Sequence, residues 1–241
     1  VDAVRVADAH PVLAARAAHD LRGFLTLVAR GRPHVVLKLA QDAGGRTRPP
    51  AGGYLTGPAA RARVHALRAE VDAVLVGGAT VRADDPGLDV RHVPAGRQPR
   101  PVVLTASGDL PPDARILARR PLVVVGPATP AERRRALAAA GAEVVAVDGD
   151  AAGPDPAAAL AALPAHGVLT VLAEPGPRLA RALLAADLVD GAELHVAGGA
   201  GVGAAVEPAV ALPGPHLRPA GAEPAGPDLV HRFARPVAGV R

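Results

Sequence analysis

The sequence predicts an α/β fold with a mostly parallel central sheet flanked by helices. Two observations lead to this fold class. Several apolar runs of strand length are continuous rather than alternating, which is expected of strands covered on both faces. Helical stretches separate several of these runs, and a strand–helix–strand order is typical of parallel sheets. The 241 residues suffice for one large domain or two small ones.

The first expected element is a helix over residues 12–31, where apolar residues recur at three- and four-residue spacing. Seven strands are then expected, at residues 34–40, 71–77, 101–105, 121–126, 142–147, 168–173 and 192–197. Helices are expected between several of them, at residues 57–70, 129–140, 155–163 and 177–188. Residues 203–227 are rich in Pro, Gly and Ala, which predicts a loop. A final strand is expected in "DLVHRFARPV", residues 228–237.

The composition excludes several classes of protein and site. The sequence has no cysteine, which rules out disulfides, thiol nucleophiles and cysteine-ligated zinc. Its nine histidines are spread singly without ligand spacing, so we expect no metal site. The net charge is only +4 and aromatic residues make up 1%, which disfavours nucleic-acid binding. No apolar run reaches the length of a membrane span and no export signal is present, so we expect a cytoplasmic protein without membrane partners.

Lys38 is the only lysine in the chain, and the other 26 cationic residues counted with it are arginines. The dominance of Ala, Arg, Gly, Pro and Val is typical of GC-rich coding, under which a surface lysine is readily replaced by arginine. A site that needs a compact, rotatable ammonium does not accept the planar guanidinium. Lys38 therefore has two interpretations that the composition leaves open: a functional ammonium, or a lysine that has survived by chance.

Two further turns combine glycine with polar residues at the ends of expected strands, where α/β sheets bind their ligands. "VGGATVRADDP", residues 76–86, runs from a strand into two glycines, a threonine and paired acids. "LAEPGPRLARALL", residues 172–184, passes Glu174 and Gly176 before entering a helix. A glycine at a helix start exposes N–H groups that suit an anion. Each turn alone is equally an ordinary strand-to-helix connection, and residues 84–86 also fit a helix N-cap.

The chain contains, in this order, "GRPHVVLKLA", "VHALRAEVDAVLVGGATVRADDPGLDVR" and "LAEPGPRLARALLAADLVDGAELHVAGGAGVG". Together these segments resemble the reductase domain of the bacterial riboflavin-biosynthesis proteins. The resemblance runs from about residue 31 to the end and is densest over residues 52–91. It implies a dihydrofolate-reductase-like fold. It also implies NADPH-dependent reduction of 5-amino-6-(5-phosphoribosylamino)uracil to the ribitylamino product in riboflavin biosynthesis.

The resemblance implies roles for nine residues. The positions that match catalytic residues facing the substrate are Lys38 and Glu174. The positions that match cofactor-binding residues are Tyr54, Thr80, Asp84 and Gly176, with Tyr54 standing where the family usually has tryptophan. The positions that match substrate-binding residues are Arg68, Leu88 and Arg91. Forked guanidinium groups suit the 5′-phosphate of such a substrate.

The resemblance also implies the domain organisation and the partners. Residues 1–31 match a helical connector, and residues 32–241 match the reductase domain. In many relatives a zinc deaminase domain precedes this connector, and the absence of cysteine excludes that activity from this chain. The expected partners are NADPH, a small phosphoribosylaminopyrimidine and a second copy of the chain in a homodimer.

Three departures from the family pattern affect the substrate side more than the cofactor side. Gly44 stands in "KLAQDAGGR" where the family has an aspartate, and Gly52 replaces a serine. Pro175 interrupts what is commonly Glu-Gly-Gly. Two alternatives therefore stay open: a related reductase that acts on another pyrimidine- or pterin-like compound, and a degenerate paralogue without catalytic activity.

Overall fold

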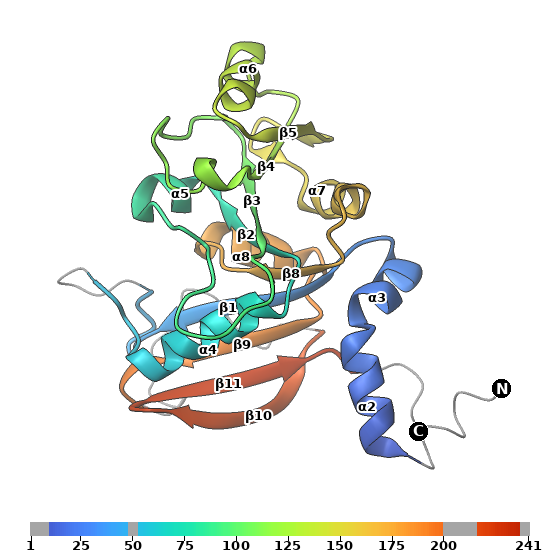
Figure 1. The fold of residues 1–241 in the computed structure, drawn as a ribbon, viewed down its shortest axis with the longest axis vertical. Helices are drawn as coiled ribbons and strands as arrows, with labels where there is room; N and C mark the ends of the chain where they lie inside the picture. The colour runs from blue at the N-terminus through green and yellow to red at the C-terminus, as the bar shows by residue number, and fades with distance from the viewer. Residues whose placement is uncertain (1–9, 48–52, 200–215, 237–241) are drawn as a thin grey trace.

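The computed structural model describes residues 10–47, 53–199 and 216–236. Their central feature is a nine-stranded sheet with the order β10-β11-β9-β1-β8-β2-β3-β4-β5, which twists along the long axis of the molecule (Figure 1). Neighbouring strands are parallel from β9 to β5, whereas β11 is antiparallel to β9 and β10 to β11. The predicted mostly parallel α/β sheet is confirmed.

The seven strands of the parallel part overlap the predicted ranges. They are β1 His34–Gln41, β2 Ala73–Gly77, β3 Arg100–Thr105, β4 Leu122–Val125, β5 Glu143–Ala146, β8 Thr170–Ala173 and β9 Gly191–Val196. The final predicted strand is present as β11, Asp228–Ala234. A small separate hairpin, which was not predicted, consists of β6 Gly149–Asp150 and β7 Gly153–Pro154.

The predicted loop over residues 203–227 is wrong in its last part, because Arg218–Ala225 form strand β10. Residues 203–215 of that prediction lie outside the described residues. Strand β10 contains two prolines, which cannot donate to a sheet, and it pairs with β11 on one side only. Proline is tolerated on such an edge strand.

The helices are α2 Pro11–Asp20, α3 Arg22–Arg30, α4 Pro58–Ala69, α5 Gly78–Asp84, α6 Ala131–Ala139, α7 Pro156–Ala162 and α8 Pro177–Ala185, with short 3₁₀ turns at Leu117–Arg119, Leu163–His166 and Ala197–Gly199. The single helix predicted over 12–31 is interrupted at Leu21, whose φ of −93° and ψ of 3° are not helical. The division into a connector, 1–31, and a reductase domain, 32–241, remains a prediction. No helix in the described ranges has the length and apolarity needed to span a bilayer.

Helix α5 was not predicted, because two glycines at its start disfavour a helix. The interpretation of residues 84–86 as a helix N-cap is wrong, since Asp84 is the last residue of α5. Asp85 follows as the C-cap, with a φ of 36°, and its Oδ1 accepts a hydrogen bond from the backbone N–H of Arg115.

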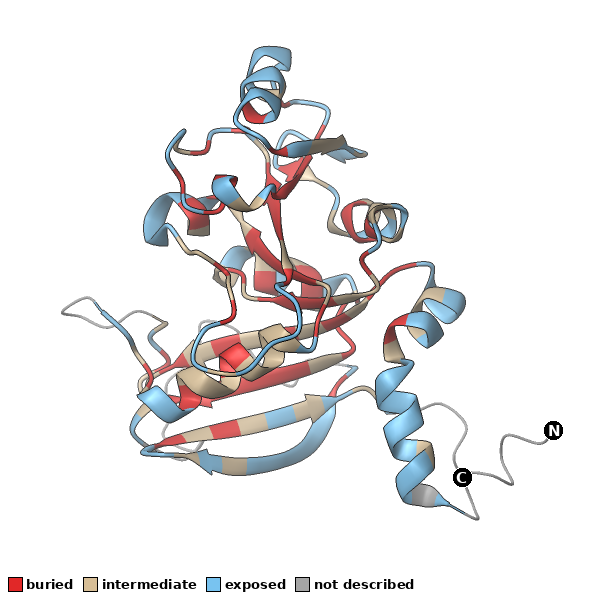
Figure 2. Ribbon diagram, in the orientation of Figure 1, coloured by how far each residue is buried: buried red, intermediate tan, exposed pale blue. Residues whose placement is uncertain are grey.

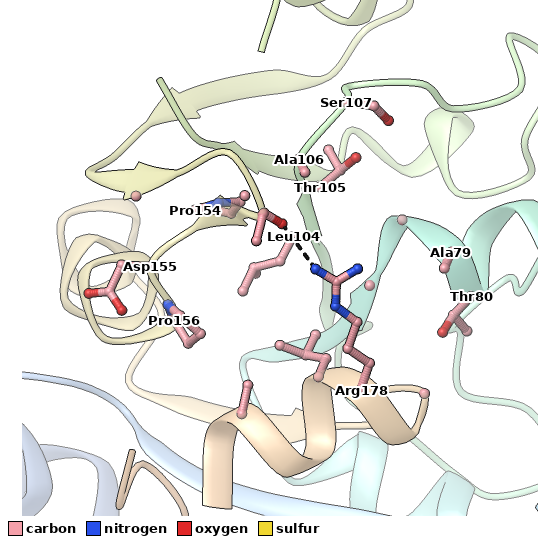
Figure 3. A pocket seen from close by; sticks show the side chains of 18 of the residues that line it. Ala79, Thr80, Leu104, Thr105, Ala106, Ser107, Pro154, Asp155, Pro156 and Arg178 are labelled. Atoms are coloured by element: carbon pink, nitrogen blue, oxygen red, sulfur yellow. Dashed lines mark hydrogen bonds between the residues drawn. The ribbon is translucent and has the colours of Figure 1, made fainter. Parts of the chain in front are cut away.

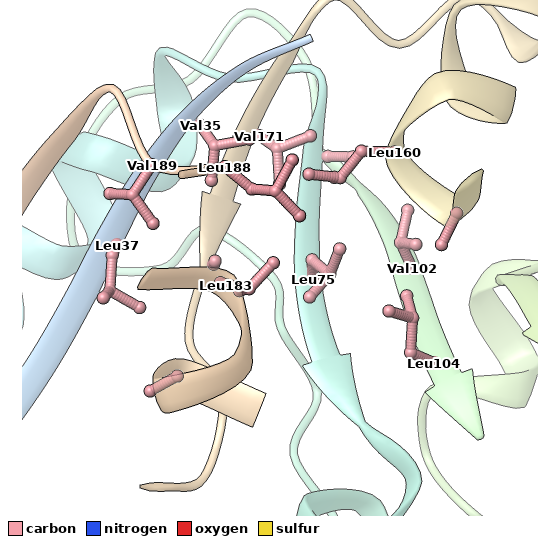
Figure 4. Packing of buried hydrophobic residues seen from close by; sticks show 14 of the residues in the cluster. Val35, Leu37, Leu75, Val102, Leu104, Leu160, Val171, Leu183, Leu188 and Val189 are labelled. Carbon is pink, nitrogen blue, oxygen red and sulfur yellow. The ribbon is translucent and has the colours of Figure 1, made fainter. Parts of the chain in front are cut away.

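The core occupies both faces of the sheet. One cluster packs α7 and α8 against one face, with Leu75, Leu160 and Leu183 among its fully buried side chains (Figure 4). Full burial of each such leucine contributes about 1.5–3 kcal/mol. A second cluster packs α5 and part of α4 against the opposite face. The central strands are accordingly buried, whereas α2 and α6 are largely exposed (Figure 2).

Strand β1 contributes to both faces, because successive side chains alternate. Leu37 points into the first cluster, and Val36 packs against the second. Lys38 therefore shares the face of Val36, on the side of α4 and α5.

A buried ion pair fixes the position of β1 beside β9. Arg32 donates to both carboxylate oxygens of Asp190, at 2.6 Å and 3.0 Å, and the same carboxylate accepts from the backbone N–H of Val35 at 2.9 Å. Both charged side chains are buried. The resulting register pairs Lys38 with Glu193.

Candidate active site

A cavity of about 720 Å³ opens at the carboxyl ends of β2 and β3 (Figure 3). Its walls are the turn from β2 into α5, the residues that follow β3, the β6–β7 hairpin and the first turns of α7 and α8. This volume is in the range of pockets that hold small ligands and cofactors. The carboxyl ends of parallel strands are also where α/β sheets bind ligands.

Two of the four predicted cofactor residues, Thr80 and Gly176, line this cavity. Gly176 is the N-cap of α8, and a Cβ added there would lie 3.7 Å from Oγ1 of Thr80, so the missing side chain keeps the space open. Tyr54 and Asp84 are not among the described residues that line the cavity. Tyr54 is 73% exposed, and its ring centroid lies 4.4 Å from the guanidinium carbon of Arg61.

Gly78 allows α5 to begin against β3. A Cβ added at Gly78 would meet Oγ1 of Thr105 at 2.8 Å and Cβ of Thr105 at 3.0 Å, closer than real contacts allow. Oγ1 of Thr105 in turn accepts a hydrogen bond from the backbone N–H of Gly108 at 3.2 Å. This close approach sets one wall of the cavity.

Two arginines bring positive charge to the cavity. Arg82 donates to the carbonyl of Asp109 at 2.8 Å, and Arg178 reaches from α8 toward the carbonyl of Ala152 in the β6–β7 hairpin, at 3.5 Å (Figure 3). The second bond is at the limit of hydrogen-bond length, so the Arg178 guanidinium is only weakly held. Arg178 was not among the predicted site residues, because the reach of a side chain across a cavity has no local pattern in the sequence.

The second part of the site is a row of three charged side chains across β9, β1 and β8, which we call the Lys38 row: Glu193, Lys38 and Glu174. Lys38 and Glu193 are registered partners. On the other side, Leu37 pairs with Ala173, so Glu174 follows in register with Lys38. Burial lowers the pKa of Lys38, whereas the charges of Glu174 and Glu193 oppose this shift. The row places the only lysine of the chain between two carboxylates.

Arg68 of α4 holds one end of the Lys38 row. Its Nε and Nη2 donate to the two carboxylate oxygens of Glu174, at 2.7 Å and 3.0 Å, and its Nη1 donates to the carbonyl of Asp89 at 3.0 Å. Burial raises the pKa of Glu174, but the charge and hydrogen bonds of Arg68 lower it by more than burial raises it. Glu174 is therefore held ionised. The first role of the Arg68 guanidinium is thus to bind Glu174, and any contact with a ligand is secondary to it.

Arg63 of α4 holds the other end. Its Nε and Nη2 donate to Glu193, at 2.8 Å and 2.5 Å, and its Nη1 binds Glu223 on β10. His195, which is fully buried, lies with Nε2 3.2 Å from Oε2 of Glu193. Although burial raises the pKa of Glu193, hydrogen bonds with Arg63 and His195 bring it to about 2.

Arg63, Glu193 and His195 were not predicted as members of the site. A signal was present, because "AELHV" places two polar side chains on one face of an otherwise apolar strand. Burial lowers the pKa of His195, so this histidine is held neutral. Its Nδ1 is buried and has no hydrogen-bond partner among the described residues.

The predicted substrate residues Leu88 and Arg91 lie on the loop after α5. Leu88 is 2% exposed and belongs to the second core cluster, so a substrate contact here would have to come from its backbone. Its φ of 52° is strained for a bulky residue, and such strain concentrates at functional sites. Arg91 is 44% exposed at its side chain, and its backbone N–H donates to Nδ1 of His65 on α4 at 3.0 Å.

The structure therefore brings six of the nine predicted residues into two adjoining groups. Thr80 and Gly176 line the cavity, and Lys38, Glu174, Arg68 and Arg91 lie on or next to the Lys38 row, whereas the Leu88 side chain lies in the core. Among the residues that the structure describes, no cluster of His, Asp and Glu could hold a metal ion.

A family model described as the RibD C-terminal domain matches residues 33–231. The chloroplastic riboflavin biosynthesis protein PYRR of Zea mays is 36% identical over 162 residues, which cover 65% of this chain and 25% of that protein. The riboflavin biosynthesis protein RibD of Aquifex aeolicus is 38% identical over 96 residues, covering 39% of this chain and 27% of that protein. The chain thus spans about a quarter of the length of these curated relatives.

The solved structure of Acinetobacter baumannii RibD is similar with a TM-score of 0.76 at 27% identity, covering 93% of this chain and 64% of that one. The riboflavin biosynthesis reductase Rib7 of Saccharomyces cerevisiae has a TM-score of 0.64 at 19% identity over 91% of this chain and 99% of that one, a likeness of fold alone. The expected dihydrofolate-reductase-like fold is confirmed. Because the family model covers most of the sequence, this chain belongs to the RibD C-terminal domain family.

Proposed function

We propose that this chain reduces 5-amino-6-(5-phosphoribosylamino)uracil to the ribitylamino product with NADPH, a step of riboflavin biosynthesis. The observation that carries the proposal is the junction of the cavity and the Lys38 row. Glu174 lies beside Lys38, and Gly176, two residues later, lines the cavity. A nucleotide in the cavity and a substrate at Lys38 would meet at this turn. The riboflavin-biosynthesis names of the relatives support the same reaction.

The cavity fits a dinucleotide cofactor. Gly176 leaves room beside Thr80, and Arg82 and Arg178 supply two cations for phosphate groups. When bound, NADPH supplies the hydride. We expect NADPH to bind in preference to NADH, because the added 2′-phosphate gains from these cations. A fluorescence titration checks this, and equal or tighter binding of NADH would contradict it.

Lys38 and Glu174 are the proposed catalytic residues. Opening of the ribosylamine ring requires a proton at the departing ring oxygen and leaves an iminium ion, whose carbon accepts the hydride. Lys38 can supply this proton or hold the developing charge, because its lowered pKa makes the ammonium a better acid than a solvated lysine. Glu174, held ionised by Arg68, keeps the ammonium in place and orients polar groups of the substrate.

The arginines near Lys38 divide the substrate contacts between them. Arg68 uses its guanidinium on Glu174 and Asp89, so Arg91, with its more exposed side chain, is the better partner for the 5′-phosphate. We propose direct phosphate binding by Arg91 and indirect support by Arg68. The cofactor contacts of Tyr54 and Asp84 and the substrate contact of Leu88 remain predictions.

We also propose that the chain forms a homodimer, as the resemblance implies. Exposed apolar side chains are concentrated on α2 and α3, and β10 is a free edge of the sheet among the described strands. Either surface could contact a second copy. Light scattering at micromolar concentration distinguishes the dimer from the monomer, because a mass near 24.1 kDa would show a monomer.

The main alternative is a related reductase with another pyrimidine- or pterin-like substrate. Gly44 leaves its position without a carboxylate, and the nearby Asp42 already accepts hydrogen bonds from Gly44 and Arg46 in its own turn, at 2.7–2.9 Å. The departure at Gly52 lies outside the described residues.

Oxidation of NADPH in the presence of the phosphoribosylaminouracil, against a control without substrate, tests the proposed function. Substrate-dependent turnover supports it. Tight NADPH binding without turnover of this substrate contradicts it and favours another substrate or a degenerate paralogue.

A further inference from the structure

We propose that Arg63 and Glu193 are positioning residues for Lys38: Arg63 fixes the Glu193 carboxylate beside the ammonium, and this fixed carboxylate favours the charged ammonium while leaving it available to a ligand. The inference deepens the proposed reductase function and rests on it. Neither residue is among the nine that the family resemblance selects.

The register of the sheet puts Glu193 next to Lys38. The two residues are partners in the parallel pair β1–β9, so their side chains leave the sheet on the same face. Helix α4 covers this face, since its Arg63 binds Glu193 and its Arg68 binds Glu174. One helix therefore holds the carboxylates on both sides of a single lysine.

The hydrogen bonds of Glu193 restrict its carboxylate. Both oxygens accept from the fork of Arg63, and Oε2 also lies 3.2 Å from Nε2 of His195. Arg63 is itself tied to Glu223 on β10, so α4, β9 and β10 are joined around the carboxylate. Glu193 acts on Lys38 through charge, while its preferred hydrogen-bond directions are used by Arg63. The ammonium protons stay available for a substrate.

The charges around Lys38 explain why the position of Glu193 matters. The titratable and charged groups that face this part of the sheet are Glu174 after β8, Glu193 and His195 from β9, Glu223 from β10, Arg232 from β11, and Arg63, His65 and Arg68 from α4. Both histidines have a lowered pKa through burial and are neutral near pH 7. The three arginines and three glutamates balance, so the loss of Glu193 leaves a net positive charge beside the ammonium and disfavours its protonated form.

The single lysine makes this testable without any substrate. Protein labelled with ¹⁵N or ¹³C at lysine gives one lysine side-chain signal, and its pH titration by NMR reports Lys38 alone. Glu193→Gln should lower the pKa of Lys38 by about one unit or more, a typical effect of losing a close opposite charge. The matched control is Glu223→Gln, which removes a carboxylate from the same Arg63 but outside the Lys38 row, and it should shift the titration much less.

Arg63→Gln should shift the pKa of Lys38 in the direction opposite to the shift in Glu193→Gln. It removes a cation and frees Glu193 to bind the ammonium directly, so the pKa of Lys38 should rise. It should also lower kcat for the proposed reduction about tenfold or more, with the KM for NADPH little changed, because a misplaced ammonium costs rate rather than cofactor affinity. This variant also decides the matter if Glu193→Gln does not fold.

An unchanged Lys38 titration in either folded variant, or equal shifts in Glu193→Gln and Glu223→Gln, would overturn the inference. Wild-type protein that lacks reductase activity would contradict the proposed function only. The NMR titration would then still decide whether Arg63 and Glu193 control the charge of Lys38, so the two failures are distinguishable.

Discussion

Arg68 and Glu174 lie 106 residues apart in sequence and form two hydrogen bonds, of 2.7 Å and 3.0 Å, between α4 and the end of β8. Their side chains are only 11% and 15% exposed. The pair is therefore largely desolvated, and its geometry matches the parallel fork that arginine and carboxylate prefer. It fixes the proposed catalytic carboxylate beside Lys38, and removing either partner leaves the other charge buried.

Arg68→Gln should therefore destabilise the protein by about 3–5 kcal/mol, the usual cost of breaking a buried pair from one side. The pKa of Glu174 should also rise, because Arg68 is the main group that lowers it. Denaturant unfolding measures the loss. As the control, Arg135→Gln removes an exposed guanidinium from α6 and should change the free energy of unfolding by less than about 0.5 kcal/mol. Equal losses in the two variants would contradict the role given to the pair.

Lys38→Arg should lower the proposed reductase rate by about a hundredfold, because the wider guanidinium displaces the substrate from its reactive position. The melting temperature and the affinity for NADPH should change little. Glu174→Gln should behave similarly in rate, since it removes a charge from the same row. Steady-state kinetics with a thermal melt check both variants, and wild-type turnover by Lys38→Arg would mean that the lone lysine survived by chance.

Lys38→Met should raise the melting temperature while abolishing activity. The folded state lowers the pKa of Lys38 below its unfolded value of 10.5, so the charged ammonium costs stability at neutral pH. This cost is complete below the folded pKa and disappears above 10.5, where lysine is neutral in both states. Each ~1 kcal/mol regained corresponds to about 2–4 °C in a chain of this size. A lower melting temperature for Lys38→Met near pH 7 would contradict the argument.

Glu193 should contribute to the free energy of unfolding at neutral pH, and this contribution should be lost in acid. Its pKa falls from 4.5 to about 2 on folding, which corresponds to about 3 kcal/mol in favour of the folded state above pH 4.5. That contribution is lost as the pH falls through 4.5 toward 2. Denaturant unfolding of wild type and Glu193→Gln should therefore differ most near pH 6 and converge near pH 2. A difference that does not depend on pH would refute this.

The strands were predictable because their runs of Val and Leu carry a local signal, as in β1 and β4. Strand β10 was not predicted, since its Pro, Gly and Ala residues indicate a loop, and only pairing with β11 makes it a strand. Helix α5 was hidden by its two glycines, whose place is set by the close approach to Thr105. In both cases contacts distant in sequence outweigh local preference.

The residues of the site likewise divide into those that a local sequence signal reveals and those that only contacts distant in sequence reveal. Lys38 and Glu174 could be chosen from strand ends and from the resemblance, and the structure places them side by side. The pair of Arg63 and Glu193 joins residues 130 positions apart, on helix α4 and on strand β9, which is the sixth strand of the central sheet to follow α4 in the sequence. No spacing in the sequence links them, so only the packing of α4 against β9 reveals the pair.

Gly78 and Gly77 allow a matched test of the cavity wall. A Cβ at Gly78 would lie 2.8 Å from Oγ1 of Thr105, whereas the nearest atom to a Cβ at Gly77 is Cδ2 of Leu179 at an ordinary 3.6 Å. Overpacking of this kind costs about 1–3 kcal/mol, which exceeds the gain of up to about 1 kcal/mol from replacing glycine in a helix. Gly78→Ala should therefore lower the free energy of unfolding and, by moving α5 relative to β3, weaken NADPH binding about tenfold, whereas Gly77→Ala should change both little. Thermal melts and fluorescence titrations of the two variants give the answer, and similar behaviour of both would mean that Gly78 does not set this wall.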